Sequence, residues 1–351
     1  MPAASGITDM ENLGADMAER KLRVALIGCG LISLYHLRAW QAAGAEVVAV
    51  CDTDRSRAEA RAKEFDVARV YGNAIDMFAQ GGFDVVDIAA SVNAHAPMAR
   101  LAANAGVHIM VQKPMCATVA EAKALIADVG DRVRFMVHEN YRFRPHYMTV
   151  RRWVDEGRIG RIRHAAISCR GSGLCEREGT VPFLIERQPY LKWFNRNLVF
   201  ETMIHHLDVL RCLVGPLRVV AARLGRLAEG LPGEDTAAIL MEGEDGLIAT
   251  ADGSLCAPGY PQLHGDRLEV IGTLGTIVME LNRIYLVGRE DETVEEVDLL
   301  GRYQECFDTV IRAFMTGLNH DAPFETDRLD NLETLELMES VYRAAGVEMN
   351  P

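Results

Sequence analysis

The sequence lacks several features that would place the chain in a membrane or on nucleic acid. No apolar run approaches the roughly 18 residues that a membrane-spanning helix needs. Lysine and arginine number 37 against 50 aspartates and glutamates, so the formal net charge is -13. A chain this acidic does not offer the basic face that phosphate binding requires. We therefore expect small-molecule partners, with neither nucleic acid nor membrane among them.

The eight cysteines are scattered, and no two of them form a C-x-x-C pair. This spacing argues against a zinc site or a disulfide framework and favours reduced thiols, as in the cytoplasm. A secretory signal has a basic segment followed by an apolar stretch, and residues 1–20 contain no such pattern. We expect them to form a flexible, acidic leader on a cytoplasmic protein.

Residues 21–145 alternate short apolar runs with amphipathic stretches, which predicts a doubly wound parallel sheet of the Rossmann type, an α/β fold. A chain of 351 residues is long enough for this domain and a second one. The predicted strands are Val24–Ile27, Val47–Val50, Val67–Tyr71, Val85–Ala89, His108–Val111 and Arg134–Val137. The predicted helices are Leu31–Ala43, Arg55–Phe65, His95–Ala105 and Val119–Val129.

Residues 146–351 have a different pattern, because contiguous strands separated by acidic turns replace the alternation. This predicts an α+β domain with a large, mainly antiparallel open sheet, whose C-terminal helices pack back toward the first domain. The predicted strands are Ile162–Cys169, Leu217–Leu227, Asp235–Met241, Leu247–Ser254, Arg267–Ile271, Thr276–Leu281 and Arg283–Val287. The predicted helices are Tyr147–Glu156, Leu198–Gly215, Arg302–Thr316 and Asp327–Ala345.

The first strand leads into a glycine-rich turn, in which Gly28 and Gly30 are followed by Leu31 and Ile32 at the start of a helix. Gly28 permits the tight turn, and Gly30 lets the backbone approach a pyrophosphate. The third glycine of the usual pattern is replaced by the small residue Ser33. The turn therefore predicts dinucleotide binding.

The second strand ends at Asp52, which can accept hydrogen bonds from the ribose hydroxyls of a dinucleotide. Its negative charge would repel a 2′-phosphate, so NAD is favoured over NADP. The alternative interpretation of Asp52 is a plain helix N-cap.

Several collinear motifs resemble the Gfo/Idh/MocA oxidoreductases, the glucose–fructose oxidoreductase and inositol dehydrogenase family. Val111–Pro114 (VQKP) is similar to the E-K-P motif of that family, and Glu201–Asp208 (ETMIHHLD) to its D-x-x-x-H-x-x-D helix. The resemblance extends over residues 21 to about 345, with further matches at Ile27–His36, Asp87–His95, Tyr141–Pro145, Glu234–Thr236 and Ile271–Gly275. Departures from the family pattern are Ser33 for Gly, Gln112 for Glu and Glu201 for Asp.

The resemblance implies site residues in both domains. On the cofactor side it implies Gly28, Gly30, Leu31, Ile32, Asp52, Arg57, Ser91, Asn93, His95, Gln112 and Lys113. Asn93 and His95 would line the nicotinamide side of the cleft. The alternative for His95 is a structural residue at the start of a helix, with its ring hydrogen-bonded to backbone groups.

Lys113, His205 and Glu201 are the candidate catalytic residues. Lys113 follows a parallel strand, at the edge where open α/β sheets bind ligands, and its ammonium can stabilise a developing alkoxide. His205 suits proton transfer near neutral pH. Glu201 stands four residues before His205, so on an α-helix it could orient the imidazole or touch substrate. The alternative for Lys113 is an ordinary surface lysine. The alternatives for Glu201 and His205 are an ordinary helix pair or a metal-binding pair. We expect no metal, because spacing shows no third ligand.

Residues 171–196 combine many hydrogen-bond donors, Arg177 among them, with aromatic faces, which suits a polyhydroxylated substrate or a sugar acid. The candidate substrate residues are Arg142, Tyr190, Trp193, Arg196 and His206. Interdomain packing or an oligomer contact is the alternative for each, and a structural role is the alternative for His206. The stretch from Arg187 to Asp208 is also similar to aldose dehydrogenases of the family.

These observations predict an NAD-dependent dehydrogenase that acts on a CH–OH group of a sugar, polyol or sugar acid, including oxidation of an aldose to a lactone. Two alternatives stay open. One is glycoside hydrolysis or elimination with tightly bound NAD, and the other is a non-catalytic NAD or sugar sensor. A wide open sheet in the second domain also predicts a homodimer or homotetramer.

Overall fold

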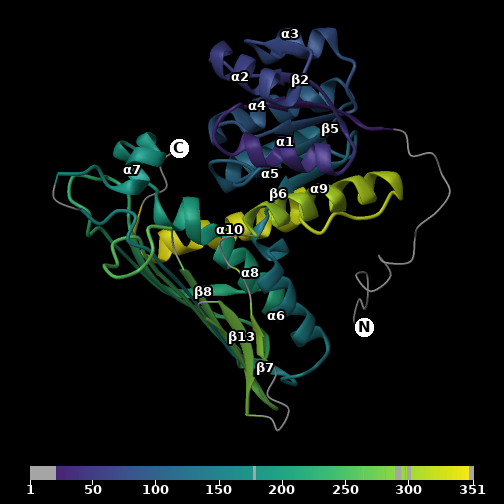
Figure 1. The fold of residues 1–351 in the computed structure, drawn as a ribbon. Coiled ribbons are helices and arrows are strands. Elements are labelled where there is room, and N and C mark those ends of the chain that lie inside the picture. Colours follow the sequence, from purple (N-terminus) through teal and green to yellow (C-terminus); the bar gives the residue numbers. More distant parts are fainter. Residues whose placement is uncertain are drawn as a thin grey trace.

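The computed structural model describes residues 21–176, 179–263, 265–280, 282–288, 294–296, 298 and 302–347. The predicted leader, residues 1–20, lies outside the described residues, as does Arg177. Figure 1 shows a layered first domain above an open, curved second sheet, with the two C-terminal helices running between them. No helix of the described residues combines the length and apolarity needed to cross a membrane.

The first domain is built on a six-stranded parallel sheet with the order β3-β2-β1-β4-β5-β6, flanked by helices. This is the doubly wound arrangement of a Rossmann domain. The strands are β1 Arg23–Ile27, β2 Glu46–Cys51, β3 Arg69–Tyr71, β4 Val85–Ile88, β5 His108–Gln112 and β6 Phe135–His138. The helices are α1 Ser33–Ala42, α2 Arg55–Phe65, α3 Ala74–Gln80, α4 Val92–Asn104 and α5 Val119–Val129.

The turn after β1 requires glycine at its first position. Gly28 has φ +95°, and a Cβ there would lie 2.5 Å from the carbonyl oxygen of Ala89. A Cβ on Gly30 would meet nothing within 4 Å, so the space above Gly30 is open. Ser33 is buried, and its hydroxyl donates to the Gly30 carbonyl oxygen at 2.5 Å, which closes the turn onto α1.

The second domain holds an eight-stranded sheet with the order β14-β13-β12-β11-β7-β10-β9-β8. Its pairings are antiparallel except for β7 with β10. The strands are β7 Ile162–Arg170, β8 Arg218–Gly225, β9 Thr236–Glu242, β10 Ile248–Ser254, β11 Gly265–Gly272, β12 Thr276–Glu280, β13 Arg283–Val287 and β14 Val294–Glu296. One face is covered by α6 Pro145–Asp155 and α8 Ile204–Val214 (Figure 1).

Shorter helical turns complete the chain around these sheets. They are η1 Tyr141–Phe143, α7 Phe183–Arg187, η2 Pro189–Lys192, η3 Leu198–Met203 and η4 Glu244–Gly246. Of these, η3 is a π-helix that runs directly into α8.

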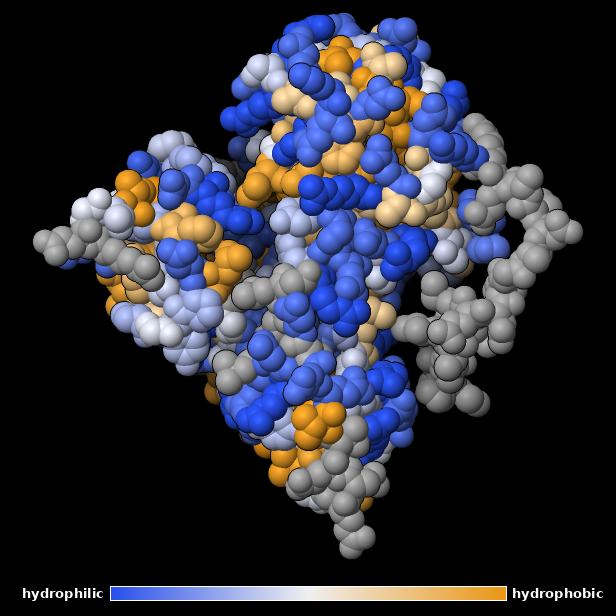
Figure 2. All heavy atoms as spheres, in the orientation of Figure 1, coloured by the Kyte–Doolittle hydropathy of each residue, from blue (hydrophilic) through white to orange (hydrophobic). Residues whose placement is uncertain are grey.

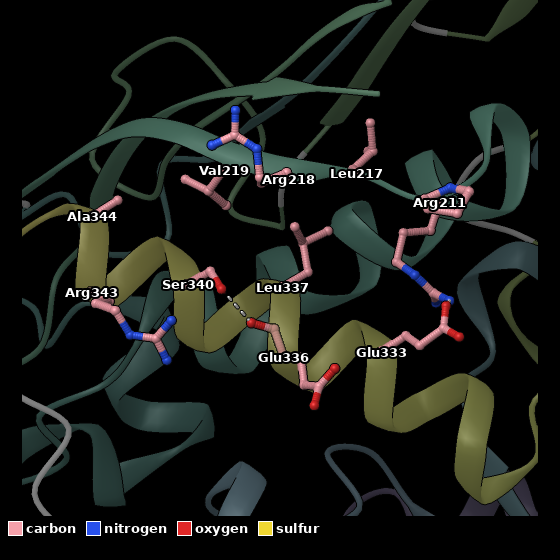
Figure 3. Close-up of a pocket in the computed structure, with 11 residues that line it drawn as sticks. Arg211, Leu217, Arg218, Val219, Glu333, Glu336, Leu337, Ser340, Arg343 and Ala344 are labelled. Carbon is pink, nitrogen blue, oxygen red and sulfur yellow. Dashed lines mark hydrogen bonds and ion pairs between the residues drawn. The ribbon is translucent and has the colours of Figure 1, made fainter. Parts of the chain in front are cut away.

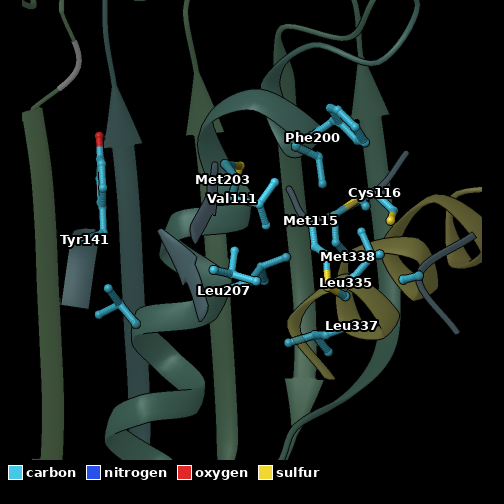
Figure 4. Close-up of a cluster of buried hydrophobic side chains, with 14 of the residues drawn as sticks. Val111, Met115, Cys116, Tyr141, Phe200, Met203, Leu207, Leu335, Leu337 and Met338 are labelled. Carbon is cyan, nitrogen blue, oxygen red and sulfur yellow. The ribbon is translucent and has the colours of Figure 1, made fainter. Parts of the chain in front are cut away.

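Helices α9 Tyr303–Asn319 and α10 Arg328–Ala344 bind the second half of the chain to the first domain. Phe307 and Phe314 of α9 share a core cluster with Trp40 of α1. Between the two helices, the Thr326 carbonyl accepts from the backbone N–H of Val137 at 2.8 Å, so the chain covers the β6 edge. Figure 4 shows a second cluster, in which Met338 of α10 packs near the residues that follow β5.

The predicted fold class is confirmed, and most elements lie within a few residues of their predicted bounds. Three elements have the same first and last residues as predicted: helices Arg55–Phe65 and Val119–Val129, and strand Arg283–Val287. The sequence does not predict α3, α7 and β14, which are only seven, five and three residues long. The division at residue 145 stays a prediction.

Candidate active site

Lys113 follows β5 at the carboxyl edge of the Rossmann sheet, and its ammonium points to the helix that carries Glu201. The Nζ atom donates to the Glu201 carbonyl oxygen at 2.7 Å and lies 3.7 Å from the Glu201 Oε2 atom. The side chains are 13% and 22% exposed, so both are partly open to solvent. The structure therefore brings Lys113 and Glu201, which are 88 residues apart, to one place.

The π-helical turn η3 sets the position of Glu201. The Glu234 carboxylate accepts from the backbone N–H groups of Asn197 and Val199, at 3.2 and 3.0 Å, and thereby caps the start of the turn. Gly253 of β10 makes room for it, because a Cβ there would lie 2.7 Å from the Met203 sulfur. Extended helical turns of this kind occur often at functional sites.

His205, on the first turn of α8, is nearly buried and has a fixed orientation. Its Nδ1 atom lies 2.5 Å from Oε1 of Glu139, and its ring stacks on Tyr141 with centroids 4.0 Å apart and an interplanar angle of 7°. Burial, reinforced by the nearby Lys113 ammonium, holds the pKa of His205 well below its usual range. Lys113 lies on the same sheet edge as Glu139, the partner of His205, because the residues just before Lys113 and Glu139 are paired between β5 and β6.

The expectation that Glu201 orients His205 was wrong. It assumed an α-helical i,i+4 pair, whereas Glu201 lies in the π-helical turn and contacts Lys113 instead. The partner of His205 is Glu139, which sequence reasoning missed. A carboxylate directly after the sixth strand, in His138–Asn140, was the available signal, because carboxyl ends of parallel strands meet at one edge.

The residues expected to hold the dinucleotide lie around the glycine turn and the ends of β2 and β4. The Asp52 carboxylate accepts from the backbone N–H groups of Cys29 and Asp54, at 2.7 and 2.8 Å. Each of its oxygens keeps a lone pair for a ribose hydroxyl. Leu31, Arg57, Ser91 and Asn93 are exposed, and Ile32 is half-buried; the Arg57 Nε atom lies 3.3 Å from Asp54. With open space at Gly30, these residues fit an NAD molecule.

Gln112 lies beneath the site rather than in it. Its Oε1 accepts from the backbone N–H of Lys113 at 2.8 Å, and its Nε2 is 3.0 Å from Nε2 of His36. The other ring nitrogen of His36 lies 2.8 Å from Asp87, which also accepts from the Trp40 indole at 2.7 Å. The network supports the backbone that carries Lys113.

His95 does not reach the nicotinamide side of the cleft as expected. It is buried, and its Nδ1 and Nε2 atoms lie 2.9 and 3.1 Å from the carbonyl oxygens of Pro114 and Ala90. The backbone-satisfied alternative therefore describes this histidine, which joins α4 to the loop after β5.

Arg142 and His206 are both buried and hydrogen-bonded within the protein, which favours the packing and structural alternatives over the expected contact with substrate. The Arg142 side chain is 5% exposed and donates to Asp208 through Nε and Nη2, at 2.7 and 2.5 Å. His206 is fully buried between the Thr202 carbonyl and Asp266, at 3.2 and 2.9 Å. Arg142 is an interdomain anchor and His206 part of the core.

Three candidate substrate residues lie on the segment that leads into η3. The Tyr190 hydroxyl forms a side-chain hydrogen bond with Glu201, and burial raises the pKa of Tyr190. Arg196 donates to the Ala117 carbonyl oxygen at 2.8 Å and lies over the Phe200 ring. Trp193 is 70% exposed, and Figure 2 shows hydrophobic side chains gathered on the lobe around α7. Tyr190 thus touches the Lys113–Glu201 pair, while Trp193 stands free at the surface.

Cys169, His206 and Asp266 place three possible metal-binding atoms within 4.8 Å of one another. The Asp266 carboxylate already accepts from the Tyr147 hydroxyl at 2.8 Å, and the Arg144 guanidinium lies 3.7 Å from it. A cation beside Arg144 would be repelled, so these residues form a buried hydrogen-bonded cluster and not a metal centre.

A separate hollow of about 660 Å³ lies between α10 and β8 (Figure 3). None of its lining residues belongs to the group around Lys113 and His205. Arg211 and Arg218 at its wall are paired with Glu333 and Glu242. The hollow is thus distinct from the site described above.

Comparison with known proteins gives the class to which this fold and site belong. Residues 22–138 match the family model for GFO/IDH/MocA oxidoreductases with an NAD-binding Rossmann fold, and residues 147–278 match the GFO/IDH/MocA C-terminal domain. The chain therefore belongs to the GFO/IDH/MocA family of NAD-binding oxidoreductases. The family resemblance, the fold class and NAD as the cofactor are confirmed.

Individual relatives cover nearly the whole chain. It is 32% identical over 339 residues to D-apiose dehydrogenase from Paraburkholderia graminis, which covers 93% of this chain and 88% of that protein. It is 29% identical over 344 residues to inositol 2-dehydrogenase from Rhizobium meliloti, covering 93% and 97%. An oxidoreductase from Agrobacterium radiobacter, solved in complex with NAD+, L-tartaric acid and magnesium, is 30% identical with a TM-score of 0.86, covering 93% and 97%.

Proposed function

We propose that this protein is an NAD-dependent dehydrogenase that oxidises a hydroxyl carbon of a sugar, polyol or sugar acid, with an aldose as the leading candidate. The observation that carries the proposal is that Lys113 and His205 are both held at the carboxyl edge of the Rossmann sheet. Lys113 contacts Glu201 and His205 contacts Glu139, and the residues just before Lys113 and Glu139 are paired between β5 and β6. The relatives named as D-apiose dehydrogenase and inositol 2-dehydrogenase support the substrate class.

Lys113 and His205 have different roles in the proposed alcohol oxidation. NAD, when bound, supplies the acceptor for the hydride that leaves the substrate carbon. Lys113 donates a hydrogen bond to the reacting hydroxyl and stabilises the negative charge that develops on its oxygen. His205 accepts the hydroxyl proton on Nε2, which has no partner among the described residues, whereas Nδ1 is held by Glu139. Glu201 keeps Lys113 in place through its carbonyl oxygen.

The segment from Tyr190 to Arg196 supplies the substrate contacts in this proposal. Tyr190 borders the reacting group through Glu201, and the exposed Trp193 ring offers a flat face for the C–H surface of a sugar. Arg196 adds positive charge that suits a carboxylate on a sugar acid. Oxidation at the anomeric carbon, which gives a lactone, is the finer form of the proposal.

A panel of aldoses, polyols and sugar acids, incubated with NAD and followed by NADH absorbance, tests the proposal. We expect turnover on at least one aldose, and much slower turnover with NADP because Asp52 repels a 2′-phosphate. Product without net NADH would instead favour NAD-assisted glycoside cleavage or elimination. NAD binding with no product from any sugar or glycoside would favour a sensor. Either of these two results would overturn the proposed dehydrogenase function.

We also propose that the exposed face of the second sheet pairs copies of this chain as a homodimer or homotetramer. Large apolar residues stand exposed on three adjacent strands, at Val220 of β8, Leu240 of β9 and Ile248 of β10. Burying such a face would remove apolar surface from water. Light scattering should give two or four times the chain mass of 38.7 kDa, reduced in Leu240→Glu/Ile248→Glu. A monomeric wild-type protein at micromolar concentration would contradict this. Cytoplasmic location stays a prediction.

A further inference from the structure

Glu139 is a buried carboxylate whose position the fold alone does not explain. It stands directly after β6 and is fully buried. Its Oε1 accepts from the backbone N–H of Tyr141 at 3.0 Å and lies 2.5 Å from Nδ1 of His205. Its Oε2 is buried and has no hydrogen-bond partner among the described residues. Since burying a carboxylate is costly, a residue held this way calls for a role that uses its charge.

The contact between Glu139 and His205 determines which ring nitrogen of the histidine carries a proton. An ionised carboxylate can only accept, so the Nδ1 atom must donate to Glu139. In a neutral imidazole this leaves the lone pair on Nε2, which is the nitrogen that can take up a proton from a bound molecule. The parallel Tyr141 ring prevents the imidazole from tilting away.

We propose that Glu139 is the positioning residue for His205: it fixes the tautomer that acts as a base and stabilises the imidazolium formed during the reaction. This inference rests on the proposed dehydrogenase function. In the step, the substrate O–H and C–H bonds break and a C=O bond forms. The hydroxyl proton goes to Nε2 of His205, and the hydride goes to the cofactor. The Nδ1 proton stays in the hydrogen bond with Glu139, as in other carboxylate–histidine pairs.

The surroundings of His205 show why a carboxylate is needed there. Burial disfavours the charged imidazole most, and the Lys113 and Arg144 cations add to this effect. Glu139 is the acid in direct contact with the ring, and burial raises the pKa of its own carboxyl. The titratable and charged groups facing the imidazole are Glu139 and His138 at the end of β6, Lys113 after β5, Tyr141 and Arg144 near η1, and His206 and Asp208 of α8.

Glu139→Gln and Glu139→Ala separate charge from orientation. Glutamine can still accept from Tyr141 N–H and Nδ1–H, but it brings no charge. We expect kcat to fall about 10-fold to 100-fold in Glu139→Gln with KM nearly unchanged, and about 1000-fold in Glu139→Ala. The base is active when neutral, and losing the negative neighbour lowers its pKa. The acid limb of the kcat–pH profile should therefore move to lower pH in Glu139→Gln. Glu46→Gln, at the exposed start of β2 and so at the opposite end of the sheet from the site, is the matched control.

Nitrogen NMR of histidine-labelled protein gives a readout that does not depend on turnover. The ring signals of His205, assigned by their loss in His205→Asn, should show a proton on Nδ1 in the wild type and a mixture of tautomers in Glu139→Ala. An unchanged tautomer in Glu139→Ala, or an unchanged kcat–pH profile in Glu139→Gln, would overturn the proposal. If the wild type oxidises no substrate, the proposed function fails, while the NMR result still decides the role of Glu139.

Discussion

Lys113→Met should lower kcat/KM for the sugar substrate about a thousandfold, the loss typical of removing a donor that stabilises a developing oxyanion. Methionine keeps the length and apolar stem of lysine but removes the ammonium, which donates to the Glu201 carbonyl oxygen at 2.7 Å. NAD affinity should fall much less than kcat/KM, because Lys113 is one of several implied cofactor contacts and the glycine turn and Asp52 lie on other loops. Steady-state kinetics and NAD titration measure the two quantities separately.

The matched control for this substitution is Lys123→Met. Lys123 is an exposed lysine of α5 that pairs with Glu336, away from the site. It should keep wild-type kinetics within about twofold, since exposed ion pairs contribute little. If Lys113→Met retained a tenth or more of the wild-type kcat/KM, Lys113 could not be the group that holds the reacting oxygen.

Arg142→Met should lower the free energy of unfolding by about 3–5 kcal/mol, as expected when one partner of a buried ion pair is removed. Arg142 and Asp208 are 5% and 0% exposed, and two hydrogen bonds join them. The guanidinium also reaches Asp330 of α10 at 2.9 Å, so it ties η1 to α8 and α10. Removing it leaves the buried Asp208 carboxylate with the Thr334 hydroxyl, at 2.9 Å, and the Arg211 guanidinium, at 3.9 Å, as its nearest partners among the described residues.

Urea unfolding of three variants tests this explanation. Arg142→Met/Asp208→Leu should recover much of the lost stability, because no buried charge is left unpaired. Arg218→Met breaks an exposed ion pair with Glu242 and should change stability by less than about 1 kcal/mol. A small loss in Arg142→Met, comparable to that in Arg218→Met, would mean that water reaches Asp208.

The parts of the fold that could be predicted are those that depend on local pattern. The glycine turn at Gly28 and the carboxyl-edge position of Lys113 follow from a strand, a tight turn and a helix in sequence. The parallel pairing of β7 with β10 could not be predicted, because nothing within either strand distinguishes a parallel neighbour from an antiparallel one.

Only some members of the site could be predicted from the sequence, and few of their contacts. Lys113 and His205 were identified from motif position, but the Glu139–His205 contact joins residues 66 apart in sequence. Glu201 was assigned to the wrong partner because a regular helical period was assumed through a π-helical turn. The sequence cannot show that Arg142 is paired with Asp208, because that buried carboxylate lies 66 residues further along the chain.

The way α9 and residue Thr326 complete the first domain has a consequence for how the chain comes off the ribosome. Phe307 and Phe314 of α9 pack in the cluster that contains Trp40, and Thr326 binds the edge of β6, so the nascent first domain emerges with part of this apolar cluster and the strand edge uncovered. Both are sites where partly made chains associate wrongly. The first domain, whose strands and helices are made early, is thus completed once residues 303–326 have been synthesised.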